Sequence, residues 1–149
     1  MKKIFIYYSL TGNGDEVAKY LKDKRIDIRK VETKEPLPKS MFLSILTGGF
    51  KAGIGYKDKL LDFNPNISNY DEVIIGSPLW NDRLSCPINT VLDEIDFVGK
   101  KVTFILYSGS GKTKKAQEKI KAKCENAQII LLKEPKKHKT LLKEYLKDI

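Results

Sequence analysis

Two glycine-rich stretches of this sequence contain residue types that bind anions or nucleotides. One is "SLTGNG" at residues 9–14, and the other is "SGSGKT" at residues 108–113. The second is similar to the end of the triphosphate loop G-x-x-x-x-G-K-S/T, which would require a glycine at position 106. That position holds Leu106, whose side chain lies in an apolar run where backbone would have to approach the phosphates. The sequence therefore argues against a triphosphate loop, and these glycines need another explanation.

The first stretch has the composition of a phosphate-binding loop. It offers hydroxyls, an amide and two glycines, and it leads into a predicted helix whose first N–H groups attract anions. No Lys or Arg occurs between Lys3 and Lys19, so neutral donors and the helix dipole would hold the phosphate. Asp15 and Glu16, in the first helical turn, would have to point away from it. The alternative is a plain strand-to-helix turn rich in capping residues.

Other reactive side chains are few. Cys86 precedes Pro87 at a predicted helix start, a setting that can lower a thiol pKa, but a passive thiol is the simpler interpretation because no partner cysteine is near. Cys124 falls on an apolar helical stripe, and His138 lies among lysines. The sequence has no C-x-x-C spacing, no Ser-His-Asp set and no metal-ligand cluster, so nothing predicts a zinc site, a disulfide framework or hydrolysis.

Apolar segments bounded by turn residues predict the strands that must position the glycine-rich loops. Four of them are continuously apolar, as expected for strands covered on both faces of a parallel sheet. These four lie at residues 4–8, 73–77, 102–108 and 128–132. Residues 25–32 alternate instead, which suits an edge strand.

Helical patterns alternate with these strands. Apolar residues at helical spacing occur at residues 17–21, 88–95, 116–124 and 141–146. The stretch "SMFLSILTGGFKAGIGY" at residues 40–56 is interpreted as a helix from about Lys39, broken around its glycines, with an apolar lid or partner surface as the alternative. The alternation predicts an α/β fold, an open parallel sheet with helices on both faces.

Length and composition place the chain among ordinary globular proteins. Its 149 residues suit a single domain, residues 1–149, and 41% of them are hydrophobic and 32% charged. No stretch approaches the ~18 apolar residues of a membrane span, and no cleavage pattern follows the short apolar run at the start. We therefore expect a cytoplasmic protein without a membrane partner.

The charge of the chain is strongly positive and uneven. The net charge is +9, and residues 112–149 contain 12 lysines against 5 acids. Such an excess can mark a nucleic-acid surface or a surface for an acidic partner. These lysines recur on the polar sides of two predicted helices without interleaved exposed aromatics, so a solvated face is favoured over nucleic-acid binding.

Three loops of unusual composition follow the carboxyl ends of the predicted strands, where parallel sheets bind their ligands. They are "SLTGNG", "SPLWNDRLSCP" and "SGSGK". The first resembles the T/S-x-T-G-x-T phosphate loop of flavodoxins, with Ser9, Thr11, Gly12 and Asn13 matching. The other two are similar to the flavin loops of that family, so the resemblance extends over nearly the whole chain.

The resemblance implies a flavodoxin-like three-layer sandwich that binds FMN, with a five-stranded parallel sheet of order 2-1-3-4-5. It places the cofactor among Ser9, Leu10, Thr11, Gly12, Asn13, Gly14, Ser77, Pro78, Leu79, Trp80, Asn81, Ser108, Gly109, Ser110 and Gly111. Trp80 would pack on the flavin ring, or else close over the sheet edge. Two features depart from the family: Gly14 replaces the last threonine of the phosphate loop, and flavodoxins are usually acidic.

This resemblance implies an electron carrier that docks to redox partner proteins, as a monomer or weak dimer. One alternative is an NAD(P)H-dependent FMN quinone reductase-type enzyme. The chain has no second nucleotide module, which favours the carrier. Another alternative, motivated by Gly14, is a binding module that keeps the fold without flavin.

Overall fold

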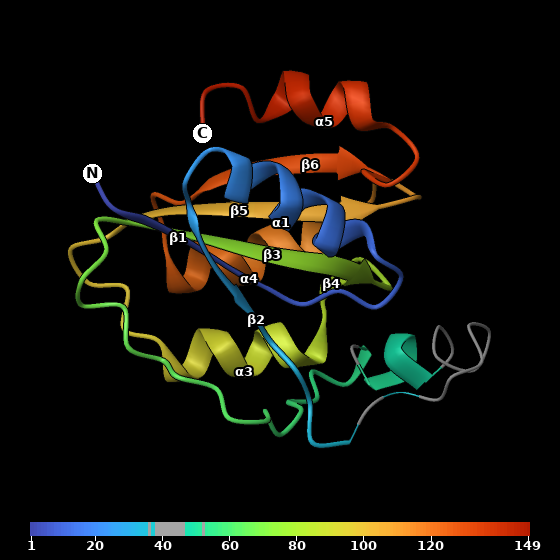
Figure 1. Cartoon of the computed structure of the whole chain (residues 1–149). Coiled ribbons are helices and arrows are strands. Elements are labelled where there is room, and N and C mark those ends of the chain that lie inside the picture. Colours follow the sequence, from blue (N-terminus) through green and yellow to red (C-terminus); the bar gives the residue numbers. More distant parts are fainter. Residues whose placement is uncertain (36, 38–46, 52) are drawn as a thin grey trace.

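The centre of the structure is a parallel β-sheet with helices on both faces (Figure 1). The computed structural model describes residues 1–35, 37, 47–51 and 53–149. Five strands run parallel in the order β2-β1-β3-β5-β6. Their bounds are Lys3–Tyr7 for β1, Asp27–Lys30 for β2, Glu72–Trp80 for β3, Lys101–Ser108 for β5 and Gln128–Lys133 for β6. This order of parallel strands confirms the predicted architecture.

The helices form two layers that bury separate hydrophobic clusters. Their bounds are Asn13–Asp23 for α1, Cys86–Glu94 for α3, Lys114–Lys123 for α4 and Lys139–Tyr145 for α5. Apolar side chains of α1 and α5 pack on one face of the sheet, and those of α3 and α4 pack on the other. The continuous apolar runs of β3 and β5 supply both clusters, because successive side chains of a strand point to opposite faces.

The stretch after β3, predicted as a loop, begins as a β-hairpin. Residues 78–80 extend β3 past its predicted end, and the short strand β4 (Arg83–Leu84) pairs with this extension in the antiparallel sense. The two turn residues, Asn81 and Asp82, have φ angles of 51° and 62°. Two-residue hairpin turns require such angles, and Asn and Asp tolerate them better than most residues. The sequence prediction ended this strand at residue 77, directly before Pro78, but a strand that runs past its neighbour tolerates proline.

The segment between β2 and β3 is described in part. Residues 47–51 are helical, whereas most of the helix predicted from about Lys39 lies outside the described residues. In the described part of the chain, no helix combines the length and apolar character needed to cross a bilayer.

Candidate functional site

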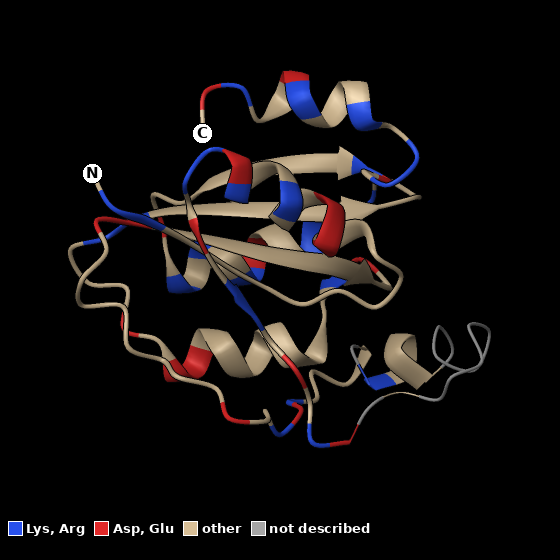
Figure 2. Ribbon diagram, in the orientation of Figure 1, with Lys and Arg blue, Asp and Glu red and all other residues tan. Residues whose placement is uncertain are grey.

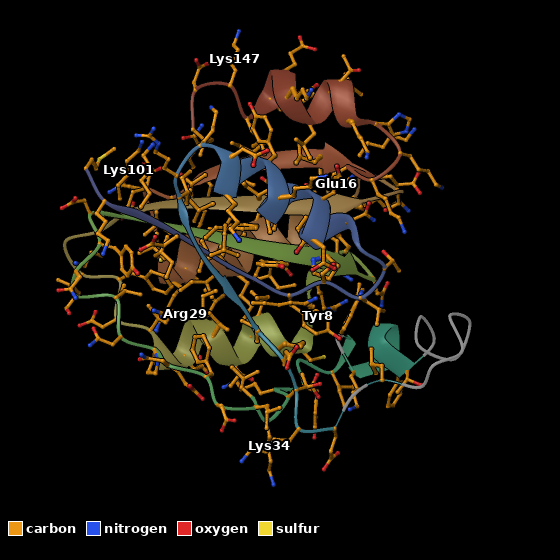
Figure 3. The ribbon with its side chains drawn as sticks, in the orientation of Figure 1. Tyr8, Glu16, Arg29, Lys34, Lys101 and Lys147 are labelled. Carbon is orange, nitrogen blue, oxygen red and sulfur yellow. The ribbon has the colours of Figure 1, made fainter. Side chains whose placement is uncertain are left out.

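The carboxyl ends of β1, β3 and β5 bring the three predicted loops to one edge of the sheet. Tyr7 pairs with Gly76, and two residues further along β3, Pro78 pairs with Tyr107. The arrowheads of β3, β5 and β6 point to this edge in Figure 1. Figure 3 shows Tyr8 and Glu16 toward the same edge and Lys101, at the start of β5, toward the opposite one. The loops therefore meet where parallel sheets bind ligands.

The loop between β1 and α1 presents a row of backbone donors. Gly12 has a φ of 92°, a left-handed conformation that favours glycine, and it turns the chain into α1. The N–H groups of residues 9–14 have no hydrogen-bond acceptor among the described residues. Thr11 adds an exposed hydroxyl, which accepts a hydrogen bond from Asn13 Nδ2 at 3.3 Å. Consecutive free N–H groups at a helix start form an anion-binding arrangement.

The acidic residues of the first turn of α1 are paired with side chains from outside the loop. Ser9 Oγ accepts a hydrogen bond from the Asp15 N–H at 3.3 Å and so satisfies one donor of the first turn, whose N-cap residue is Gly12. The Asp15 carboxylate accepts hydrogen bonds from Tyr7 Oη at 2.9 Å and Lys30 Nζ at 2.8 Å. Burial alone would raise the pKa of Asp15, but these hydrogen bonds outweigh it and hold that pKa below its usual value. Glu16 lies 3.2 Å from Lys139 Nζ.

Gly14 is buried beneath the loop, in a space that no side chain fits. A Cβ there would lie 2.5 Å from Tyr107 Oη and 2.9 Å from Tyr7 Cδ2. Tyr107 Oη donates a hydrogen bond to the Tyr8 carbonyl and so links the ends of β5 and β1. The departure from the flavodoxin pattern therefore has a packing cause: the tyrosine occupies the space a threonine would need.

A cation from the far end of the chain lies next to the loop. The Lys136 N–H donates a hydrogen bond to Asn13 Oδ1 at 3.0 Å. Its side chain passes Gly12, where a Cβ would lie 3.5 Å from Lys136 Nζ. The loop itself carries no cation, as the sequence indicates, but the segment between β6 and α5 brings one to it. This residue was not identified from the sequence. Lys136 is one of many lysines in its segment and lies 123 positions from Asn13, so no local pattern marks it.

Trp80 lies at the carboxyl end of β3, half-buried. Its ring meets the Tyr8 ring edge-on, with 5.8 Å between the centroids. Gly48 lies against the same indole, because a Cβ on that glycine would be 3.2 Å from Trp80 Cε3. The indole thus belongs partly to the core on the α3 and α4 side and partly to the ligand edge. Both predicted roles, packing at the site and closing the sheet edge, are compatible with this position.

A buried polar cluster lies on the same side of the sheet as Trp80. Asp58 is buried and forms an ion pair of 3.3 Å with Lys51. Burial, together with the Asp58 charge, raises the pKa of Tyr8 to about 12 and that of the Cys86 thiol to about 11. Cys86 therefore stays a protonated thiol near neutral pH, despite its place at the start of α3.

The hairpin residues differ in what they offer a ligand. Ser77 is fully buried, and its Oγ accepts a hydrogen bond from the Ser85 N–H at 3.1 Å. The Ser77 hydroxyl therefore bonds within the hairpin, and the predicted contact of this residue with the flavin stays a prediction. Pro78 and Leu79 are half-buried, and Asn81 is exposed at the turn. Of these residues, Asn81 is the most exposed, and its carbonyl accepts a hydrogen bond from Arg83 Nη1 at 3.3 Å.

The loop after β5 is exposed at the same edge. Ser108 Oγ accepts a hydrogen bond from the Ser110 N–H at 3.2 Å, and Gly111 has a φ of 73°. Residues 108–111 also line a cavity of about 380 Å³ together with Leu131, Lys133, Leu141 and Tyr145. A larger cavity of about 730 Å³ lies at the other edge of the sheet, between the ends of α3 and α4 and the start of β5. Parallel sheets bind ligands at their carboxyl edge. The candidate functional site is therefore the carboxyl edge, where the three loops meet, and not the larger cavity at the opposite edge.

Comparison with known proteins agrees with this geometry. The family model for flavodoxin matches residues 2–149. A flavoprotein from Lactobacillus acidophilus, solved in complex with FMN, has a TM-score of 0.69 and 18% identity, over 93% of this chain and 97% of that one. A proposed flavoprotein from Bacteroides uniformis has a TM-score of 0.72 and 19% identity, over 99% and 98% of the two chains.

Enzymes share the fold as well. An FMN-dependent NADH-azoreductase from Bacillus anthracis has a TM-score of 0.51 and 13% identity, over 97% of this chain and 96% of that one. Among curated protein sequences, none matches the chain. At these identities the structural likeness establishes the fold alone, whereas the family match spans nearly the whole sequence. The chain belongs to the flavodoxin family.

Proposed function

We propose that this protein binds FMN at the carboxyl edge of its sheet and carries electrons between partner proteins. The observation that carries the proposal is the row of N–H groups at residues 9–14 without acceptors among the described residues, next to Trp80 on the neighbouring strand. A phosphate and a planar ring need these two features side by side. Membership in the flavodoxin family supports the choice of FMN over other phosphorylated ring compounds.

The residues present fit the parts of this cofactor. The N–H groups of residues 9–14 and the Thr11 hydroxyl would receive the phosphate. Trp80 and the exposed peptides at Asn81 would lie along the ring, and the glycines of residues 108–111 would bring N–H groups to its pyrimidine side. Gly14, although part of the loop, contributes backbone only.

FMN, when bound, supplies the capacity to accept and release electrons. The chain's contribution is to bind and orient it. The helix dipole and the first N–H groups of α1 would hold the phosphate, and the half-buried indole would shield one side of the ring from water. The N–H groups of Gly109 and Gly111 would stabilise negative charge that develops nearby, since the Ser110 N–H already donates to Ser108 Oγ.

Titration of flavin-free protein with FMN, and in parallel with riboflavin, tests the proposal. Flavin fluorescence reports binding, and Trp80, the only tryptophan, provides an independent signal because a ring beside it quenches its emission. We expect tight binding of FMN and much weaker binding of riboflavin, which lacks the phosphate. If neither flavin binds at micromolar concentration, the site serves some other ligand and the proposal is wrong.

Anaerobic mixing of the FMN-loaded protein with NADH or NADPH separates a carrier from a reductase. A carrier has no site for the nicotinamide donor, so its flavin absorbance should stay unchanged over minutes. Rapid loss of flavin absorbance with either nucleotide would instead indicate a reductase. The azoreductase of similar fold is an example of that alternative.

A further inference from the structure

We propose that Lys136 is the cation of the phosphate loop and that it sets the preference of the site for a phosphorylated flavin. The inference rests on the proposed FMN site and deepens it. It assigns the recognition of phosphate charge to a residue outside the loop, in the segment that joins β6 to α5. A chain whose loop lacks Lys and Arg thereby acquires a charged partner for the phosphate.

The backbone of Lys136 is anchored to the loop. Its N–H donates to Asn13 Oδ1 at 3.0 Å, and the same Asn13 side chain donates from Nδ2 to Thr11 Oγ1 at 3.3 Å. Pro135 is buried beside it, and the Lys137 N–H donates to the Glu134 carbonyl at 2.8 Å, which closes a tight turn. This turn and the phosphate loop are therefore held together independently of any ligand.

The Lys136 side chain then runs over Gly12. A Cβ on Gly12 would lie 3.5 Å from both Cδ and Nζ of the lysine and 3.8 Å from its Cε. The ammonium thus lies at the turn where the loop enters α1, close to the N–H groups that have no acceptor among the described residues. An anion on those N–H groups would lie within reach of the ammonium.

The neighbouring charges leave Lys136 free to act on an anion. Glu16 pairs with Lys139 at 3.2 Å, and Glu134 pairs with Lys137 at 2.6 Å. Asp15, on the other side of the loop, pairs with Lys30. The Lys136 ammonium lies within ion-pair distance of none of the carboxylates in the described residues. Figure 2 shows the lysine-rich segment between β6 and α5 at the edge where the arrowheads of the sheet point.

The test compares two flavins on flavin-free protein with variants of one side chain. Lys136→Gln removes the charge and keeps the backbone N–H that bonds to Asn13, and Lys136→Arg keeps the charge. Lys143→Gln, which removes an exposed lysine of α5, is the matched control. We expect Lys136→Gln to raise the dissociation constant for FMN about tenfold, the scale of one charge-assisted contact, and to leave riboflavin binding unchanged.

The salt dependence of FMN binding provides a second readout. It would not differ between the wild-type protein and Lys136→Gln if Lys136 had a purely structural role. Added salt should weaken FMN binding to the wild-type protein and to Lys136→Arg more steeply than binding to Lys136→Gln. Equal FMN affinity in Lys136→Gln and Lys143→Gln, within twofold, would overturn the inference while leaving the FMN site intact. A parallel rise in both FMN and riboflavin dissociation constants would overturn it as well, since it would indicate a general loss of the site.

The failure of the proposed function has a different signature. If the wild-type protein binds neither flavin, the FMN site itself is wrong, and titration with inorganic phosphate then tests Lys136. Amide chemical shifts of Gly12 and Asn13 would move with phosphate in the wild-type protein and move less in Lys136→Gln. Identical shifts in both proteins would reject the role of Lys136 in anion binding altogether.

Discussion

At the scale of single residues, Gly14 is a position where packing dictates the residue type. Alanine is a better helix former than glycine by about 1 kcal/mol, so Gly14→Ala should stabilise α1 if space allowed. Space does not allow it, because the added Cβ meets Tyr107 and Tyr7. We expect a net loss of about 1–3 kcal/mol in the free energy of unfolding, measured with urea.

Two further substitutions serve as controls for this prediction. Gly49→Ala adds a Cβ to a helical glycine with open space around it and should not destabilise the protein. Tyr107→Phe removes the oxygen closest to the added methyl, so the Gly14→Ala penalty should shrink in that background. A Gly14→Ala protein as stable as the wild type would contradict the packing explanation.

The raised pKa of the Cys86 thiol predicts how stability and thiol reactivity depend on pH. Burial and the nearby Asp58 raise its pKa from 9.0 to about 11, so the folded state favours the protonated form. This contribution to stability is fully present below about pH 9, declines as the pH rises and is lost above about pH 11. In a Cys124→Ser background, Cys86 should react with iodoacetamide about a hundredfold more slowly in the folded protein than in urea, near neutral pH. Equal rates in the two states would show that the thiol is accessible and ionised.

At the scale of elements, Glu72 ties three strands together at the edge opposite the site. Its carboxylate is buried at the start of β3, with Oε2 3.2 Å from Lys3 Nζ of β1 and Oε1 3.4 Å from Lys101 Nζ of β5. Thr103 Oγ1 also donates to Oε1 at 3.3 Å. The contact with Lys3 is an ion pair without hydrogen-bond geometry, since Oε2 accepts no hydrogen bond among the described residues.

Replacing this carboxylate tests its contribution without touching the site. Glu72→Gln removes both ion pairs and should lower the free energy of unfolding by about 1–3 kcal/mol, because the Lys3 side chain is largely shielded from water whereas that of Lys101 is exposed. Urea unfolding measures the loss, and the FMN dissociation constant should stay the same because the change lies at the other edge. A loss of FMN affinity would show that the two edges are coupled.

At the scale of the whole molecule, the net charge of +9 sets the partners that the proposed carrier would meet. A positive protein attracts acidic partners and anionic reactants and repels cations. The reduced, FMN-loaded protein should therefore pass electrons faster to the anion ferricyanide than to the cation hexaamminecobalt(III). The ratio of the two rates should be larger than the difference in driving force alone would give. Stopped-flow mixing should find that added salt slows the first reaction and speeds the second. The same salt response for both oxidants would contradict electrostatic steering.

Much of this molecule follows from local sequence patterns. The strands of the parallel sheet and the donors of residues 9–14 were predictable because apolar runs and glycine-rich turns are local signals. The hairpin after Trp80 was not, since proline usually marks a strand end and the pairing depends on a neighbouring strand. The hydrogen bond from the Ser85 N–H to Ser77 Oγ was not predictable either, because it exists only once the hairpin has formed. The contact between Lys136 and Asn13 depends on how the whole chain folds back, which no local pattern contains.

The hydrogen bond between Lys136 and Asn13 also has a consequence for the order of events during synthesis. A ribosome makes the chain from its amino terminus, so residues 9–14 emerge long before the segment that docks on them. Until the segment after β6 is in place, the loop lacks both its contact with Lys136 and the cation that we propose for it. The proposed anion site therefore becomes complete only after residue 136 has been synthesised and has docked on the loop.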